Sequence, residues 1–90
     1  MLLGKVVGTI WATRKDEKLV GMKLLVVRHV DLDYQLKNSY VVAVDSVGAG
    51  AGEIVLLTTG SSARQSALTE GKPVDAVISA IVDKMDVSET

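Results

Sequence analysis

The sequence predicts an all-β fold in a single domain that spans residues 1–90. Ninety residues are too few to build two hydrophobic cores. Valine fills 15 positions, phenylalanine is absent, and only Trp11, Tyr34 and Tyr40 are aromatic. Because β-branched aliphatic side chains are enriched in strands, this composition favours β-sheet over helix.

Four segments have the hydrophobic pattern of strands, either alternating or apolar on both faces. These strands are expected at residues 3–12, 22–30, 40–47 and 53–59. Residues 13–18 are charged and predict a solvated loop between the first two. Residues 31–39 predict a polar connection in which Leu32, Tyr34 and Leu36 alternate with polar side chains.

The C-terminal third contains one predicted helix and one segment with two interpretations. Ser61 or Ser62 suits the N-cap of a short helix that ends at Ala67. Residues 73–85 have the apolar spacing of a helix and a proline suited to its first turn. Their β-branched content and the short length of the apolar run favour a buried strand instead, and periodicity alone cannot decide for so short a run.

Counting this segment as a fifth strand, the elements predict a small five-stranded β-barrel with one short helix, of the oligonucleotide/oligosaccharide-binding (OB) type. Hydrophobic residues make up 48% of the chain. One small barrel cannot hide so much aliphatic surface, so we expect part of it to face another subunit.

A glycine-rich segment separates the third and fourth strands. Residues 43–64 read AVDSVGAGAGEIVLLTTGSSAR, with Gly48, Gly50 and Gly52 in alternation. This spacing allows positive φ and the close approach of another chain. A phosphate-binding loop is excluded, because the run leads into a strand rather than a helix N-terminus. The segment therefore predicts geometry and contact rather than chemistry.

The polar residues of this segment have structural interpretations. We expect Ser61 and Ser62 to cap the short helix, and Arg64 to form an ion pair with Asp45 or Glu53. No pair of a nucleophile and a base is indicated, because the chain has a single histidine and no cysteine. The same composition predicts no metal site, and we expect neither enzymatic activity nor a cofactor.

The charge balance bears on possible partners. The formal net charge is −1, the isoelectric point is about 5.7, and no basic run occurs. A module that binds single-stranded nucleic acid on an OB-type barrel is the alternative function, but it needs basic grooves and stacking aromatic residues. No signal peptide and no apolar run of about 20 residues is evident, which predicts a soluble intracellular protein without a membrane partner.

Three stretches together resemble the bacterial microcompartment vertex family, the EutN/CcmL type of pentameric shell protein. They are GKVVGTIWATRKDEKLVGMKLLVVRHVD, the glycine-rich segment and PVDAVISAIVD. The family's Leu-x-Gly-x-Lys-Leu-Leu pattern corresponds here to Leu19, Gly21, Lys23, Leu24 and Leu25.

The resemblance implies a homopentamer that caps the vertices of an icosahedral shell in the bacterial cytoplasm, beside hexameric shell proteins. It also favours a strand at residues 73–85. The residues of the glycine run and of the SSAR turn resemble those of vertex proteins from catabolic metabolosomes more than those of vertex proteins from carboxysomes. Candidates for the subunit interface or the five-fold axis are Asp45, Gly48, Gly50, Gly52, Glu53, Ser61, Ser62 and Arg64.

Overall fold

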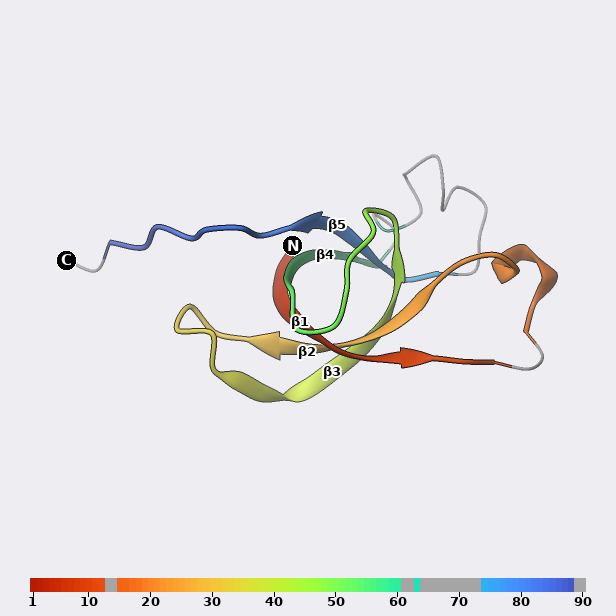
Figure 1. Cartoon of the computed structure of the whole chain (residues 1–90), viewed down its shortest axis with the longest axis horizontal. Helices are drawn as coiled ribbons and strands as arrows, with labels where there is room; N and C mark the ends of the chain where they lie inside the picture. Colours follow the sequence, from red (N-terminus) through yellow and green to blue (C-terminus); the bar gives the residue numbers. More distant parts are fainter. Residues whose placement is uncertain (13–14, 61–62, 64–73, 89–90) are drawn as a thin grey trace.

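The structure is a computed structural model that describes residues 1–12, 15–60, 63 and 74–88 (Figure 1). The strands in chain order are β1 (Leu2–Ile10), β2 (Leu24–Val30), β3 (Leu36–Asp45), β4 (Ile54–Thr59) and β5 (Ala76–Ile81). A turn of 3-10 helix, η1 (Glu17–Leu19), lies between β1 and β2, where the side chain of Asp16 accepts a hydrogen bond from the Lys18 amide.

The strands close into a barrel in the order β1-β2-β3-β5-β4. Neighbouring strands are antiparallel except β3 and β5, which are parallel. The ladder between β1 and β4 closes the barrel, from Leu2 opposite Leu57 to Lys5 opposite Ile54. The predicted five-stranded OB-like barrel is confirmed.

Aliphatic side chains fill the barrel interior. Alternate residues of each strand point inward, because successive side chains of a strand face opposite sides. Burying one such side chain contributes about 1.5–3 kcal/mol to folding. The largest fully buried side chains in this core are Val6, Leu25, Val27, Val55, Leu57 and Ile78.

A second apolar cluster lies outside the barrel and explains the ambiguous pattern of residues 73–85. Val77 belongs to this outer cluster together with Val44, Ala63 and Val74, whereas Ile78 belongs to the interior. Strand β5 is therefore covered on both faces, and a strand of that kind is apolar at successive positions. The spacing resembles a helix for this reason, and the prediction of a strand is confirmed.

The start of β3 differs from the prediction, because residues 36–39 belong to the strand and not to a polar connection. The carboxylate of Asp31 accepts hydrogen bonds from the Asp33 and Gln35 amides, and Tyr34 takes a φ of 63°. This compact turn lets Leu36 pair with Val30 across an irregularity in β2. Pairing across the hairpin thus outweighs local polarity. The helix predicted for residues 61–67 lies, apart from Ala63, outside the described residues.

The molecule is elongated, with extents of 48 × 24 × 21 Å. An arm formed by the end of β1, η1 and the start of β2 extends from one side of the barrel, as Figure 1 shows. Residues 82–88 leave the barrel at the opposite end. The arm and residues 82–88 thus lie at opposite ends of the long axis.

Candidate functional site

The glycine loop, residues 46–53, crosses the barrel between β3 and β4 (green in Figure 1). Ala49 of this loop has no exposed surface and packs in the barrel core with Val6 and Leu25. The hydroxyl of Ser46 donates a hydrogen bond of 2.6 Å to the carbonyl oxygen of Ile78. The glycine loop is therefore an integral cover of the core.

Asp45 fixes the start of the glycine loop. Its Oδ1 accepts hydrogen bonds from the amides of Val47 at 3.0 Å and Gly48 at 3.1 Å. Its Oδ2 lies 3.8 Å from Nζ of Lys23, and the Asp45 side chain is only 3% exposed. A carboxylate so deeply buried requires such donors and a positive partner to offset its lost hydration.

Lys23 joins the loop to the beginning of β2. Its Nζ donates a hydrogen bond of 2.8 Å to the carbonyl oxygen of Ala49, in addition to the contact with Asp45. One ammonium group thus holds both the first turn and the middle of the loop. Lys23 is not among the site residues predicted from the sequence, although its place in the Leu-x-Gly-x-Lys pattern marks it.

Glu53 closes the other end of the loop. Its Oε1 accepts a hydrogen bond of 2.6 Å from the Gly50 amide. The Gly52 amide donates to the carbonyl of Val6, and the Val6 amide donates to the carbonyl of Glu53. These bonds fasten the loop onto β1 beside the bulge between Val6 and Gly8.

The three glycines of the loop differ in their backbone conformation. Gly48 and Gly52 have φ values of 78° and 86°, in the region that other residues rarely adopt. Gly50 does not have positive φ, and a Cβ built on it would lie 3.4 Å from Oε1 of Glu53. The prediction of positive φ is confirmed for Gly48 and Gly52 and is wrong for Gly50.

The structure brings together only part of the predicted site. Glu53 and the three glycines lie in the glycine loop and Asp45 ends the strand before it, whereas Ser61, Ser62 and Arg64 lie outside the described residues. The carboxylates of Asp45 and Glu53 are engaged by loop amides and Lys23 rather than left free for Arg64.

The described part of the chain contains no group of three or more His, Cys, Asp or Glu side chains that could hold a metal ion. His29 is partly buried, and its Nδ1 lies 2.7 Å from Oγ of Ser39 on the neighbouring strand.

Among the described residues, no helix has the length and hydropathy required to cross a bilayer.

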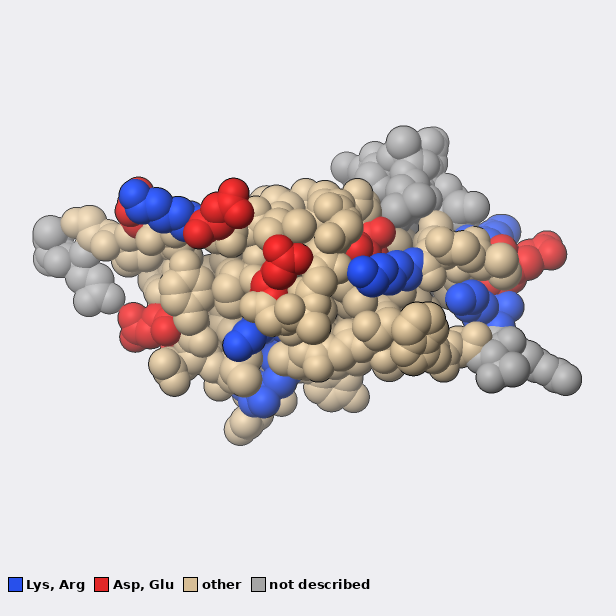
Figure 2. Space-filling view, in the orientation of Figure 1, with Lys and Arg blue, Asp and Glu red and all other residues tan. Residues whose placement is uncertain are grey.

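The outer surface of the barrel carries an apolar patch that borders the charged side chains of Lys5 and Arg28. On β3, Tyr40 and Val42 point outward and are 66% and 40% exposed. Val26 lies opposite Val42, and Gly8 lies opposite Val26, so this surface continues across β2 and β1. In Figure 2, acidic and basic side chains are scattered over a mostly uncharged face.

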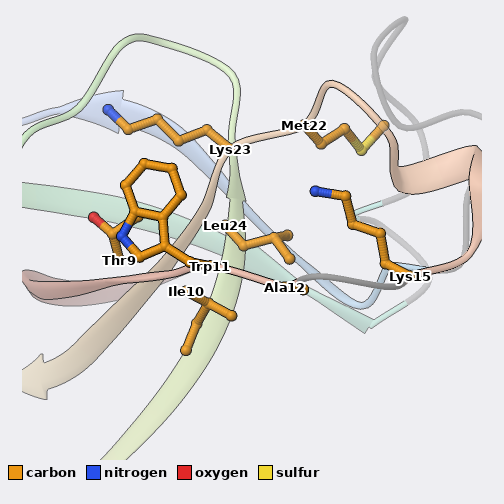
Figure 3. A pocket seen from close by; sticks show the side chains of 8 residues that line it. All are labelled: Thr9, Ile10, Trp11, Ala12, Lys15, Met22, Lys23 and Leu24. Atoms are coloured by element: carbon orange, nitrogen blue, oxygen red, sulfur yellow. The ribbon is translucent and has the colours of Figure 1, made fainter.

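A groove opens on the arm beside this surface (Figure 3). It has a volume of about 340 Å³, and we call it the Trp11 groove. Its lining includes four large apolar and two basic residues, namely Ile10, Trp11, Met22, Leu24, Lys15 and Lys23. The Trp11 side chain is 90% exposed, although tryptophan is usually well buried.

The chain is similar to known proteins over nearly its whole length. The family model described as "Ethanolamine utilisation protein EutN/carboxysome" matches residues 1–83. The shell vertex protein GrpN of Rhodospirillum rubrum is 48% identical over 86 residues, covering 96% of this chain and 97% of that protein. The carboxysome shell vertex protein CcmL of a Nostoc species is 47% identical, covering 99% and 89% of the two chains.

A solved structure of the same kind agrees with the fold. The structure named as the GrpN pentameric microcompartment shell protein of Rhodospirillum rubrum superimposes with a TM-score of 0.90 at 45% identity, and the match covers 98% of this chain and all of that one. These relatives are structural shell vertex proteins and not enzymes. The chain belongs to the EutN/CcmL family of bacterial microcompartment shell vertex proteins.

Proposed function

We propose that this chain assembles as a homopentamer that caps the vertices of an icosahedral microcompartment shell in the bacterial cytoplasm. The apolar outer surface of β1, β2 and β3 carries this proposal, because soluble monomers rarely expose a large continuous apolar surface. The pentameric relative supports a ring of five. In such a ring one patch of each subunit meets a different patch of the next.

Within the ring, the glycine loop is our candidate for the subunit interface or the five-fold axis. Gly48, Ala51 and Gly52 are exposed and carry little or no side chain, so another backbone can come close to them. Asp45 and Glu53 hold the loop rigid from within. Ser61, Ser62 and Arg64 complete the candidate set from the sequence.

We infer that hexameric shell proteins are the partners at the rim of the pentamer. A flat sheet of hexagonal tiles closes into a polyhedron only where five-fold points are introduced. The centre of a pentamer lies on its own axis, so only the rim can meet the tiles.

We further infer a catabolic metabolosome rather than a carboxysome as the compartment. The amino-acid sequence of the glycine run and of the SSAR turn supports this preference. The identities to GrpN and to the Nostoc CcmL, 48% and 47%, do not separate the two kinds.

Native mass spectrometry tests the oligomeric state. A subunit of 9.5 kDa gives a pentamer of about 48 kDa, five times that mass. A species that remains monomeric at every concentration would overturn the proposal.

Electron microscopy tests the role in the shell. Hexameric shell proteins of a catabolic compartment, co-expressed with this chain, are expected to give closed particles, and open or elongated ones when it is omitted. Carboxysome hexamers serve as the comparison, with closure in the catabolic set only as the expected result. Equally sealed particles with and without the chain would contradict the vertex role.

A further inference from the structure

The Trp11 groove is an apolar site with the cationic side chain of Lys15 in its lining. In Figure 3, Lys15 and Lys23 lie on either side of Leu24, and the Trp11 indole stands beside the Lys23 side chain. Lys15 forms no hydrogen bond or ion pair with any described residue, whereas Lys23 is half exposed while it holds the glycine loop. The groove therefore suits an extended peptide with apolar side chains and negative charges.

Residues 82–88, which we call the tail, have this composition. The Val82 amide donates to the carbonyl of Ile54, and Val82 is the last described residue whose backbone bonds to the barrel. Beyond it, Met85 and Val87 are apolar, Asp83 and Asp86 are acidic, and Lys84 is basic. In an extended chain Asp83, Met85 and Val87 share one face and Lys84 and Asp86 the other, because side chains alternate.

Asp83 is the acidic group on the apolar face of the tail, and it is exposed. The ion pair in the described part of the tail joins Lys84 and Asp86 at 3.6 Å, and both side chains are about four-fifths exposed. Lys84 and Asp86 thus pair with each other on the opposite face of the tail, and Asp83 is the carboxylate that can meet a cation of the groove.

The tail cannot fill the groove of its own subunit. The two lie at opposite ends of the long axis, which measures 48 Å (Figure 1). Seven extended residues span at most about 25 Å, and the tail points away from the arm. The groove and the tail are therefore placed for contact between different copies of the chain.

We propose that the tail of one subunit lies in the Trp11 groove of the next subunit around the ring. Met85 and Val87 cover Ile10 and Trp11, and the Asp83 carboxylate faces Lys15. Each copy gives one tail and receives one, which is the head-to-tail contact that closes a ring. This inference rests on the proposed pentamer and adds the segment that links its neighbours.

The fluorescence of Trp11 reports on the groove directly, because it is the only tryptophan of the chain. The wild-type protein is compared with the double variant Met85→Asp/Val87→Asp, after native mass spectrometry of both. We expect the wild-type pentamer to emit at shorter wavelength and to be quenched less by acrylamide than the variant. If the wild type is pentameric but its emission and quenching equal those of the variant, the inference is wrong while the proposed pentamer still stands.

Cysteine cross-linking gives a second test, since the chain has no cysteine of its own. Oxidation of the double variant Ala12→Cys/Val87→Cys is expected to give a ladder of covalent oligomers of up to five subunits. The control Leu32→Cys/Val87→Cys places the first thiol on the turn after β2, away from the groove, and should give no ladder. Only monomeric products from the Ala12 variant of a pentameric protein would contradict the inference, whereas absence of a wild-type pentamer would refute the proposed function itself.

Discussion

The ammonium group of Lys23 lies 2.8 Å from the carbonyl oxygen of Ala49, 26 residues further along the chain. This bond ties the beginning of β2 to the buried residue of the glycine loop, and the same group faces the carboxylate of Asp45. The conformation of the loop thus depends on a side chain from another element.

Replacing Lys23 by alanine is expected to destabilise the subunit. The change leaves the nearly buried Asp45 carboxylate without its cation and the Ala49 carbonyl without its donor, at a cost of about 1–2 kcal/mol. Denaturant unfolding followed by circular dichroism measures the effect. Lys84→Ala is the matched control, because Lys84 pairs only with exposed Asp86 among the described residues. Equal midpoints for the two variants would show that Lys23 does not hold the loop.

Gly4 gives a prediction about packing in the barrel. A Cβ at this position would overlap Cγ1 of Val27 and lie 3.1 Å from the carbonyl oxygen of Arg28. Gly4→Ala should therefore lower the free energy of unfolding by about 1–3 kcal/mol through overpacking. In the same strand, Gly8→Ala meets its nearest atoms at 3.8 Å and should be nearly neutral in thermal unfolding. A loss of the same size at both positions would refute the steric explanation.

The loop glycines should separate folding from assembly. Gly52→Ala forces an alanine into positive φ, which costs about 1–2 kcal/mol of folding stability. Gly50 has no such restriction, so Gly50→Val should reduce the pentamer fraction more than it reduces folding. Native mass spectrometry measures the pentamer fraction, and circular dichroism measures folding stability. Normal pentamers with an unchanged melting temperature for Gly50→Val would show that Gly50 contacts no neighbouring backbone.

Single-stranded nucleic acid should not bind to this barrel. The net charge is −1, and the face in Figure 2 shows no continuous basic groove that could neutralise phosphates. A fluorescence titration with labelled single-stranded DNA and RNA at physiological salt is expected to show no sub-micromolar binding. Saturable binding in that range would favour the alternative function considered from the sequence.

The strand content of this protein was determined by its sequence. Runs of valine and leucine such as residues 24–27 fit a strand with both faces covered, and the polar residues between the runs mark turns. The prediction of a five-stranded barrel followed from these strands. For residues 73–85, the family resemblance decided between the predictions of a helix and of a strand. The glycine loop could also be predicted from the sequence, since alternating glycines indicate an unusual backbone conformation.

The tertiary structure decided which groups meet. Gly4 is crowded because β2 brings Val27 against it, and Asp45 is buried because Lys23 and the loop amides reach it. The early start of β3 depends on pairing between Leu36 and Val30, and the role of Lys23 depends on a contact across 26 residues. Local sequence patterns report how one segment meets solvent or core, whereas these features arise from closing the barrel, which brings distant segments within a few ångströms.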